Sequence, residues 1–212
     1  SFTGGYGMTE TASVGTTASG PVFDLKPMSC GVVSPIVELR SADETDAALP
    51  APTDGEVQLR GITVTPGYWQ REEMTAETFT DDGWLRTGDV GHLDEDGFLH
   101  ITGRIKELVI RGGENIAPAE VENVAYRHEA VQEVAVFGVP DEPLGEELAM
   151  VYFPRSGMAL TVDELREHLR HQLPGFKVPR YISMSQVPLP RNVSEKIHRL
   201  ELRKEFLKNS AG

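Results

Sequence analysis

One lysine near the end of the chain, Lys196, lies in a polar segment with prolines before it and a helical pattern after it. The segment reads LPRNVSEKIHR over residues 189–199. An ammonium group held beside two reacting anions would stabilise the negative charge that develops as they combine. Most lysines, however, are solvated surface charges. Other segments of the chain must therefore show whether Lys196 is a reacting group or a surface charge.

A glycine-rich segment near the start of the chain carries a second set of reactive side chains. The sequence GGYGMTETAS, residues 4–13, holds three glycines, an aromatic ring, hydroxyls and a carboxylate. Glycines allow a backbone to approach a ligand closely, and Tyr6 could stack on a flat ring. The Thr9 hydroxyl and the Glu10 carboxylate suit phosphate contact and Mg²⁺ binding. Taken alone, the segment is better explained as a glycine-rich surface turn, because short glycine motifs are common.

An acidic and a basic residue flank a predicted hairpin over residues 89–104. Asp89 could accept hydrogen bonds from a vicinal diol such as a ribose. Taken alone, Asp89 is better explained as a residue that caps a turn, and Arg104 could equally be a surface cation. Antiparallel pairing of the two limbs would bring the ends of the hairpin together. We therefore expect Asp89 and Arg104 to be neighbours.

A pair of glycines lies in IRGGENIAP, residues 110–118. This segment is either an ordinary strand-to-helix turn or a mobile loop that lines a tunnel. The six histidines have no metal-ligand spacing with carboxylates or with Cys30, and we assign no metal to them.

The elements that must position these residues differ between the two halves of the chain. Residues 1–104 are predicted to be β-rich, with strands over 31–40 and 55–61 and the hairpin over 89–104. A short helix is expected around residues 71–79. Glycine, proline and aspartate bound these segments, as they commonly bound strands.

Residues 105–212 instead alternate helices and strands. Pro118 suits the first turn of a helix, and Thr161 with Glu164 forms a capping box that begins another. The buried faces of these two helices are expected at Val121, Val124, Ala125, Leu165 and Leu169. Strands are expected over 131–140, 148–154 and 180–184, and a terminal helix over 196–207. The pattern predicts an α+β domain with a central sheet and flanking helices.

Composition excludes several classes of function. The chain has 212 residues, 39% of them hydrophobic, and a net charge of −13. That charge argues against a nucleic-acid surface, although a few local cations can still hold a nucleotide. No apolar run approaches the roughly 18 residues of a membrane span. Cys30 is the only cysteine and no secretory segment opens the chain, so we expect a cytoplasmic protein.

Four motifs in one order resemble the adenylate-forming superfamily. Its members include acyl- and aryl-CoA synthetases, luciferases and the adenylation domains of peptide synthetases. The motifs are GYGMTE, GYWQREEMTAETF, GWLRTGDVGHLDEDGFLHITGRIKELVIRGGENIAPAEVE and LPRNVSEKIHR. The resemblance implies that residues 1–104 form the β-rich subdomain, a distorted barrel, that ends the large adenylating domain. Residues 105–212 would form the small α+β lid domain.

The resemblance also implies a two-step reaction. A carboxylate attacks the α-phosphate of ATP in the presence of Mg²⁺ and gives an acyl-adenylate and pyrophosphate; the CoA thiol then displaces AMP. The motifs favour a fatty-acyl or aryl CoA ligase. Two alternatives stay open: an adenylating enzyme that loads a carrier protein, and a non-catalytic binding module derived from the lid. Homo-oligomer formation also stays open.

Residue roles follow from the same resemblance. Tyr6 matches the aromatic that stacks on adenine, Thr9 a contact of the α-phosphate, and Glu10 the Mg²⁺ ligand. The nucleotide-binding set would be Gly5, Tyr6, Gly7, Thr9, Asp89, Arg104, Asn115 and Lys196. Within it, Asp89 and Arg104 match the residues that hold the ribose hydroxyls.

The remaining roles concern the second half of the chain. Lys106 matches the hinge between the large domain and the lid. Gly112 and Gly113 match the loop along the pantetheine channel of CoA. Lys196 matches the lysine that reaches the reacting carboxylate and the α-phosphate.

The chain departs from the family pattern in two ways. The phosphate loop T-S-G-[ST]-T-G-x-P-K does not occur in the 212 residues. We therefore expect this chain to be the C-terminal part of such an enzyme, with the upstream part of the same enzyme as its partner. We also expect that the 212 residues alone do not form an acyl-adenylate. In the lysine motif, Asn192 and Glu195 occupy the usual threonine and glycine positions, and Glu195 adds a negative charge beside Lys196.

Overall fold

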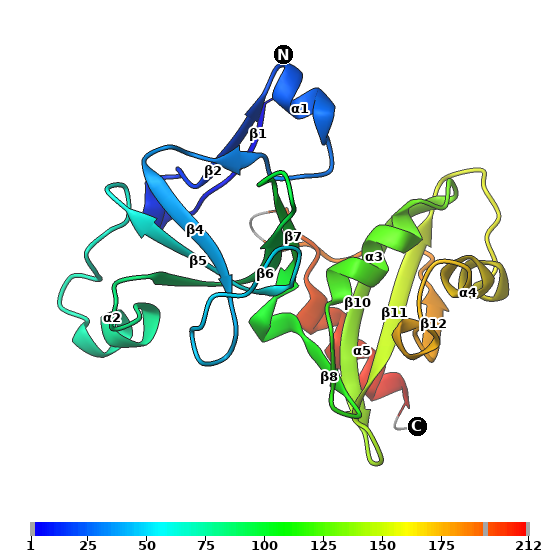
Figure 1. Cartoon of the computed structure of the whole chain (residues 1–212). Coiled ribbons are helices and arrows are strands. Elements are labelled where there is room, and N and C mark those ends of the chain that lie inside the picture. The colour runs from blue at the N-terminus through cyan, green and yellow to red at the C-terminus, as the bar shows by residue number, and fades with distance from the viewer. Residues whose placement is uncertain (1–2, 193–194, 211–212) are drawn as a thin grey trace. The chain divides into compact units, whose positions relative to one another are not determined.

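A computed structural model describes residues 3–192 and 195–210. The chain divides into two compact units, the first ending at Lys106 and the second beginning at Glu107. This division lies two residues from the predicted boundary. Figure 1 shows the elements of both units. No described helix has the length and apolar character needed to cross a membrane.

The first unit is built from two antiparallel sheets. The three-stranded sheet contains β1 (Thr3–Tyr6), β2 (Thr16–Ser19) and β3 (Val32–Val33). The four-stranded sheet contains β4 (Val37–Ala42), β5 (Gly55–Gly61), β6 (Leu85–Leu93) and β7 (Leu99–Arg104) in that order. The short helices are α1 (Pro21–Leu25), α2 (Glu72–Thr78) and a 3-10 turn at Thr9–Thr11. A second 3-10 turn, Ile105–Glu107, spans the division between the units.

The predicted barrel is wrong, because the described strands form open sheets. The four-stranded sheet pairs its strands in chain order, and β7 does not pair with β4. Backbone pairing joins the two sheets over a short stretch, where Val32 bridges Phe98 and the Leu99 N–H donates to the Gly31 carbonyl at 2.9 Å. A barrel needs its last strand to pair with its first. The predicted strand over 31–40 is also divided, with Pro35 between β3 and β4, since proline has no N–H for a strand ladder.

The second unit has one mixed sheet with helices on both faces. Its strands are β8 (Val109–Arg111), β9 (Glu114–Ile116), β10 (Val131–Asp141), β11 (Gly145–Pro154) and β12 (Tyr181–Met184). The helices are α3 (Pro118–Tyr126), α4 (Val162–Arg170) and α5 (Arg199–Ser210), with a 3-10 turn at Gly175–Lys177. β11 is the central strand: it pairs with β10 in an antiparallel hairpin and with β12 in parallel.

The period-two alternation of β10 decides which helix covers which face. Val134 and Val136 belong to the core that includes residues of α3 and α4. Ala135 and Phe137 belong to a second core with Leu202 of α5. Because successive strand residues point to opposite faces, α3 and α4 cover one face and α5 covers the other.

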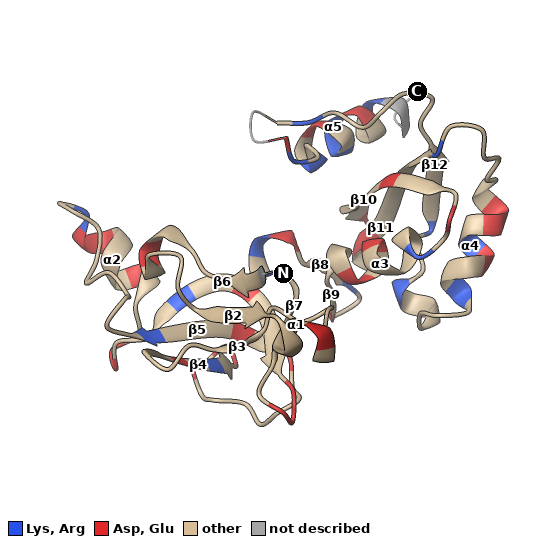
Figure 2. Cartoon of the chain, turned by 90° about the horizontal axis from the view of Figure 1, so that it is seen from above, with Lys and Arg blue, Asp and Glu red and all other residues tan. Residues whose placement is uncertain are grey.

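The α+β class is confirmed, together with most predicted elements. The buried stripes of α3 and α4 contain the predicted residues Val121, Val124, Ala125, Leu165 and Leu169. The capping box is present, with the Thr161 hydroxyl accepting from the Glu164 N–H at 3.2 Å. Charged residues of both signs are interspersed along the solvated side of α4 (Figure 2), so its exposed face is polar throughout.

Candidate functional site

In the first unit, Asp89 is the centre of a three-residue cluster. Asp89 on β6 lies opposite Arg104 on β7 in the strand register, and the Arg104 Nε lies 2.8 Å from the Asp89 Oδ1. The Tyr6 hydroxyl donates to the Asp89 Oδ2 at 2.7 Å. The expected proximity of Asp89 and Arg104 is confirmed. Tyr6 joins them from a different sheet.

Burial differs sharply within this cluster. The Asp89 side chain is 10% exposed, whereas the Arg104 side chain is 63% exposed. Burial raises the pKa of the Tyr6 phenol well above its usual range, and the neighbouring Asp89 carboxylate raises it further. Tyr6 therefore stays protonated and acts as a donor. Each carboxylate oxygen of Asp89 retains acceptor capacity, so the cluster can still accept hydrogen bonds from a diol.

Thr87 fixes the backbone beneath Asp89. Its hydroxyl accepts from the Asp89 N–H at 3.1 Å and donates to the Val57 carbonyl at 2.6 Å. Thr87 is not among the residues predicted from the sequence, although it lies in the motif that begins GWLRTGD. Its partner Val57 belongs to β5, 30 residues away, and no local pattern reveals that contact.

The Glu10 carboxylate is held by an aromatic hydroxyl. Tyr68 donates to the Glu10 Oε1 at 2.7 Å, and the Thr65 N–H donates to the Glu10 carbonyl at 2.7 Å. Tyr68 is not among the residues predicted from the sequence; its signal is the tyrosine of the GYWQREEMTAETF motif. The Tyr68 pKa is raised, first by its hydrogen bond to Glu10 and then by burial. Thr9 is exposed in the 3-10 turn beside Glu10.

Glu10 fits a Mg²⁺ ion that brings oxygen ligands with it. The described residues contain no group of three or more His, Cys, Asp or Glu side chains able to hold a metal. Mg²⁺ is usually bound through one or two carboxylates together with substrate phosphates and water. A single half-buried carboxylate beside an exposed threonine meets that requirement for a nucleotide-bound ion.

The glycines of the first motif are required by the protein's own backbone. A Cβ atom on Gly7 would lie 2.5 Å from the Ser13 carbonyl oxygen, and one on Gly5 would lie 2.7 Å from the Thr16 carbonyl oxygen. No side chain fits at such distances. The close approach of the Ser13 and Thr16 backbone therefore accounts for both glycines, and their predicted nucleotide contact stays a prediction.

In the second unit, Gly112 and Gly113 form the tight turn between β8 and β9. Their φ angles are 59° and 89°, and they separate the paired residues Arg111 and Glu114. Two positive φ angles in a two-residue hairpin turn explain why both positions are glycine. The ordinary strand-to-helix turn, one of the two alternatives, is wrong, since α3 begins five residues after Gly113. Asn115 follows on β9 and is exposed.

Lys196 lies in an exposed loop. The Asn192 N–H donates to the Lys196 carbonyl at 2.8 Å, and the Lys196 N–H donates to the Asn192 Oδ1 at 3.1 Å. The Lys196 ammonium has no hydrogen bond or ion pair with another described residue. The terminal helix was predicted from residue 196 but begins at Arg199, so Lys196 belongs to the loop.

The predicted site residues are divided between the two units. Tyr6, Thr9, Glu10, Asp89 and Arg104 belong to the first unit, together with Gly5 and Gly7. Gly112, Gly113, Asn115 and Lys196 belong to the second. Lys106 is exposed and is the last residue of the first unit.

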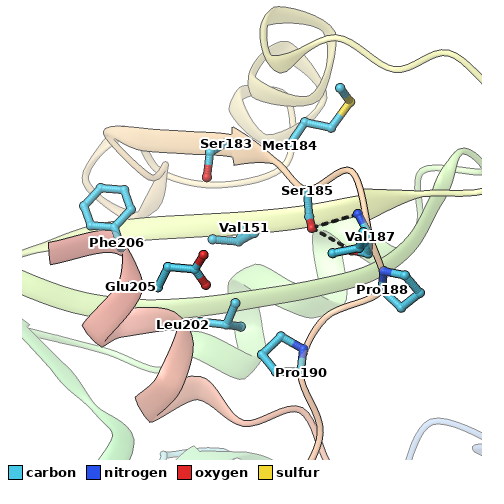
Figure 3. A pocket seen from close by; sticks show the side chains of 10 residues that line it. All are labelled: Val151, Ser183, Met184, Ser185, Val187, Pro188, Pro190, Leu202, Glu205 and Phe206. Atoms are coloured by element: carbon cyan, nitrogen blue, oxygen red, sulfur yellow. Dashed lines mark hydrogen bonds between the residues drawn. The ribbon is translucent and has the colours of Figure 1, made fainter. Parts of the chain in front are cut away.

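A pocket of about 380 Å³ lies elsewhere in the second unit, beside α5 (Figure 3). Val151 of β11 and Leu202 and Phe206 of α5 supply much of its apolar wall, and Glu205 extends into it. None of the predicted site residues lines this pocket.

Two family models match the chain. The model of the AMP-binding enzyme matches residues 1–69, and the model of the AMP-binding enzyme C-terminal domain matches residues 120–196. A mitochondrial medium-chain acyl-CoA ligase of Danio rerio is 40% identical over 94% of the chain and 33% of its own length. A feruloyl-CoA synthase of Amycolatopsis is 40% identical over 97% of the chain and 41% of its own length. The chain thus spans between a third and about two fifths of these relatives.

Solved structures of similar enzymes also match nearly the whole chain. ATP-bound MatB from Rhodopseudomonas palustris superimposes with a TM-score of 0.87 at 36% identity, over 96% of this chain and 40% of that one. The o-succinylbenzoate CoA synthetase of Bacillus subtilis, in complex with its acyl-adenylate intermediate, has a TM-score of 0.85 at 34% identity. That match covers 95% of this chain and 40% of the synthetase.

Proposed function

Because the chain belongs to the adenylate-forming superfamily of AMP-binding enzymes, we propose that it is the C-terminal part of an ATP-dependent carboxylic acid–CoA ligase. The observation that carries the proposal is the cluster in which Tyr6 and Arg104 meet the nearly buried Asp89. A fixed carboxylate beside an aromatic ring and a cation is suited to the ribose and base of a nucleotide. The matched relatives named for acyl-CoA and feruloyl-CoA formation support a fatty-acyl or aryl acid as substrate.

The first unit would hold ATP during adenylation. Asp89 accepts from the ribose hydroxyls, Arg104 restrains the Asp89 carboxylate, and Tyr6 lies beside the adenine. Thr9 donates to the α-phosphate. Glu10 would hold the Mg²⁺ ion, which when bound neutralises phosphate charge. Tyr68 orients the Glu10 carboxylate through their 2.7 Å hydrogen bond.

Lys196 would supply the positive charge for the first half-reaction. The substrate carboxylate attacks the α-phosphorus, the bond to the bridging oxygen breaks, and pyrophosphate leaves. Negative charge grows on the phosphoryl oxygens between two anions. An ammonium without another partner among the described residues is free to approach that charge, and its contribution is larger in the transition state than in the separated reactants.

The second half-reaction would use the hairpin of β8 and β9 in the second unit. The CoA thiolate attacks the acyl carbon and AMP leaves as its phosphate oxygen takes the electron pair. Gly112 and Gly113 would line the pantetheine channel with their exposed turn, and Asn115 would lie near the nucleotide. Lys106, the exposed residue at the end of the first unit, would be the hinge between the half-reactions.

A comparison of the two half-reactions tests the proposal. In the enzyme that contains this chain together with its phosphate loop, Lys196→Ala should lower the rate of adenylation by about 10²–10³-fold. Thioester formation from supplied acyl-adenylate should change far less. Pyrophosphate release and acyl-CoA yield measure the two steps.

Lys204→Ala is the matched control, because Lys204 is also exposed but lies on α5 outside the loop. We expect it to leave both rates unchanged. Equal losses in both half-reactions for Lys196→Ala would contradict the assigned role. The 212-residue chain alone should release no acid-dependent pyrophosphate from ATP, since it has no phosphate loop.

Assays of the same enzyme identify the acid substrate and the acyl acceptor. A panel of fatty and aromatic acids with ATP identifies the acid by pyrophosphate release. CoA and a phosphopantetheinyl carrier protein are then compared as acceptors. We expect acyl transfer to CoA, and exclusive transfer to the carrier would identify a carrier-loading enzyme.

A further inference from the structure

Two arginines flank Lys196 in the sequence, and the first of them joins the loop to β10. The Arg191 Nη2 lies 2.6 Å from the Oε1 of Glu133, a residue of β10 that is 8% exposed. The other carboxylate oxygen of Glu133 accepts from the Leu189 N–H at 2.7 Å. One buried carboxylate therefore binds both the backbone and the side chain at the start of the lysine segment.

Arg191 also reaches forward to the residue before Lys196. Its Nη1 donates to the Glu195 carbonyl at 2.6 Å. The guanidinium thus connects the Glu133 carboxylate to the backbone next to Lys196. A planar guanidinium fixes the geometry of both contacts more tightly than a flexible ammonium would.

The second arginine holds the other end of the segment. Arg199, at the start of α5, donates through Nε and Nη2 to the two carboxylate oxygens of Glu122, at 3.1 and 2.7 Å. Glu122 belongs to α3, is 7% exposed, and also accepts from the Val136 N–H at 2.8 Å. The third guanidinium nitrogen donates to Glu107 at 3.1 Å.

Both anchors use charges that are costly to bury. An ion pair of this kind contributes little net stability, because desolvation offsets the attraction, but the loss of one partner leaves an uncompensated charge. Between the anchors, the described loop residues bond mainly to one another, as Asn192 does with Lys196. The two arginines are consequently the charged side chains that tie the loop to the second unit, while Leu189 and Ile197 pack against the core on the sheet.

We propose that Glu133 and Glu122 are positioning residues that set the place of the Lys196 ammonium through Arg191 and Arg199. The proposal rests on the proposed role of Lys196 in adenylation. Neither glutamate is assigned a substrate contact here. Each acts through an arginine, one five residues before Lys196 and one three residues after it.

The structural half of the proposal is tested on the 212-residue chain by amide hydrogen exchange. Glu133→Gln should speed the exchange of the Leu189 and Lys196 amides by about tenfold, because the neutral amide holds Arg191 more weakly. Glu147→Gln is the control, since Glu147 is 1% exposed and pairs with Arg111 at 2.8 Å in the same sheet. It should leave those two amides unchanged. Unchanged exchange in Glu133→Gln, or an equal effect of Glu147→Gln, overturns the anchor.

The functional half is tested on the half-reactions of the enzyme that contains the chain. Glu133→Gln and Glu122→Gln should each lower kcat of adenylation by about 10- to 100-fold, as misplacement of a reacting group does. The KM for ATP and the rate of thioester formation from supplied acyl-adenylate should stay within about twofold. A general folding defect would instead lower both half-reactions together.

A double-mutant cycle separates the anchor from unrelated damage. Arg191→Gln combined with Glu133→Gln should lose no more adenylation than either single variant, because the two residues act as one unit. Additive losses, or faster exchange with unchanged adenylation, overturn the positioning role. If the unsubstituted enzyme forms no acyl-adenylate, the proposed function fails, and the exchange measurement still decides whether the anchor exists.

Discussion

At the scale of the single residue, Glu195 is the most unusual position of the lysine loop. Its φ angle is 60°, in the left-handed region that favours glycine, and the resemblance places a glycine there. The left-handed conformation costs a residue with a Cβ atom about 1–2 kcal/mol. The loop keeps the glycine conformation although the chain has glutamate.

Replacing Glu195 by glycine should therefore stabilise the second unit. We expect a gain of about 0.5–1 kcal/mol, because relief of the left-handed conformation exceeds the extra entropy of glycine in the unfolded chain. Urea unfolding measures the change. Glu195→Ala is the control, since it removes the charge but retains the Cβ atom, and it should leave stability nearly unchanged. Equal stabilisation by both variants would point to charge instead of backbone conformation.

At the scale of the element, the turn between β6 and β7 depends on Asp94. Its Oδ1 accepts from the backbone N–H groups of Asp96 and Phe98, both at 3.0 Å. Its Oδ2 contacts the Lys26 ammonium at 2.6 Å and the His100 ring at 3.0 Å. Burial opposes ionisation of Asp94, but these hydrogen bonds outweigh it and lower its pKa well below the usual range. The same hairpin brings Asp89 and Arg104 together.

Asp94→Asn should destabilise the first unit in a pH-dependent manner. A carboxyl whose pKa is lower in the folded state contributes stability above its unfolded pKa, about 3.9, and loses it as the pH falls below that value. The difference from the unsubstituted chain should be constant from about pH 5 to 8 and shrink below about pH 4. The midpoints of urea unfolding of both proteins, measured over this pH range, test the prediction.

Asp96→Asn is the matched control for this hairpin. Asp96 also contacts Lys26 at 2.6 Å, but its side chain is 70% exposed. Surface ion pairs contribute about 0–1 kcal/mol, so the loss of stability should be smaller than for Asp94→Asn. A larger loss for Asp96→Asn would contradict the central role of Asp94.

At the scale of the whole molecule, each unit has an apolar core of its own. The second unit contains two clusters on the faces of its sheet, one of which includes Leu165. In the first unit, Leu59 of β5 and Leu85 of β6 are fully buried. The division of the chain at Lys106 therefore separates parts that can each bury apolar surface.

Core substitutions should accordingly act unit by unit. Leu165→Ala should cost about 2–5 kcal/mol and lower amide protection in residues 107–210, and Leu59→Ala should do the same for residues 3–106. Mass-spectrometric hydrogen exchange resolves the two regions. Loss of protection throughout the chain in both variants would indicate a single cooperative unit.

The sequence by itself determined the elements whose signals are local. Pro118 predicted the start of α3, and the capping box of Thr161 and Glu164 predicted the start of α4. The residue types of 55–61 predicted β5. Such signals act within a few residues of the chain. The pairing of Asp89 with Arg104 also followed from a hairpin of short span. Motif order identified the family.

Only the tertiary structure decided the contacts between distant segments. Tyr68 reaches Glu10 across 58 residues, Glu133 reaches Arg191 across 58, and Glu122 reaches Arg199 across 77. The open sheets of the first unit and the hairpin turn at Gly112 likewise depend on which strands find each other. Such partners are chosen by the packing of whole sheets and helices, and no local pattern of residue types specifies them.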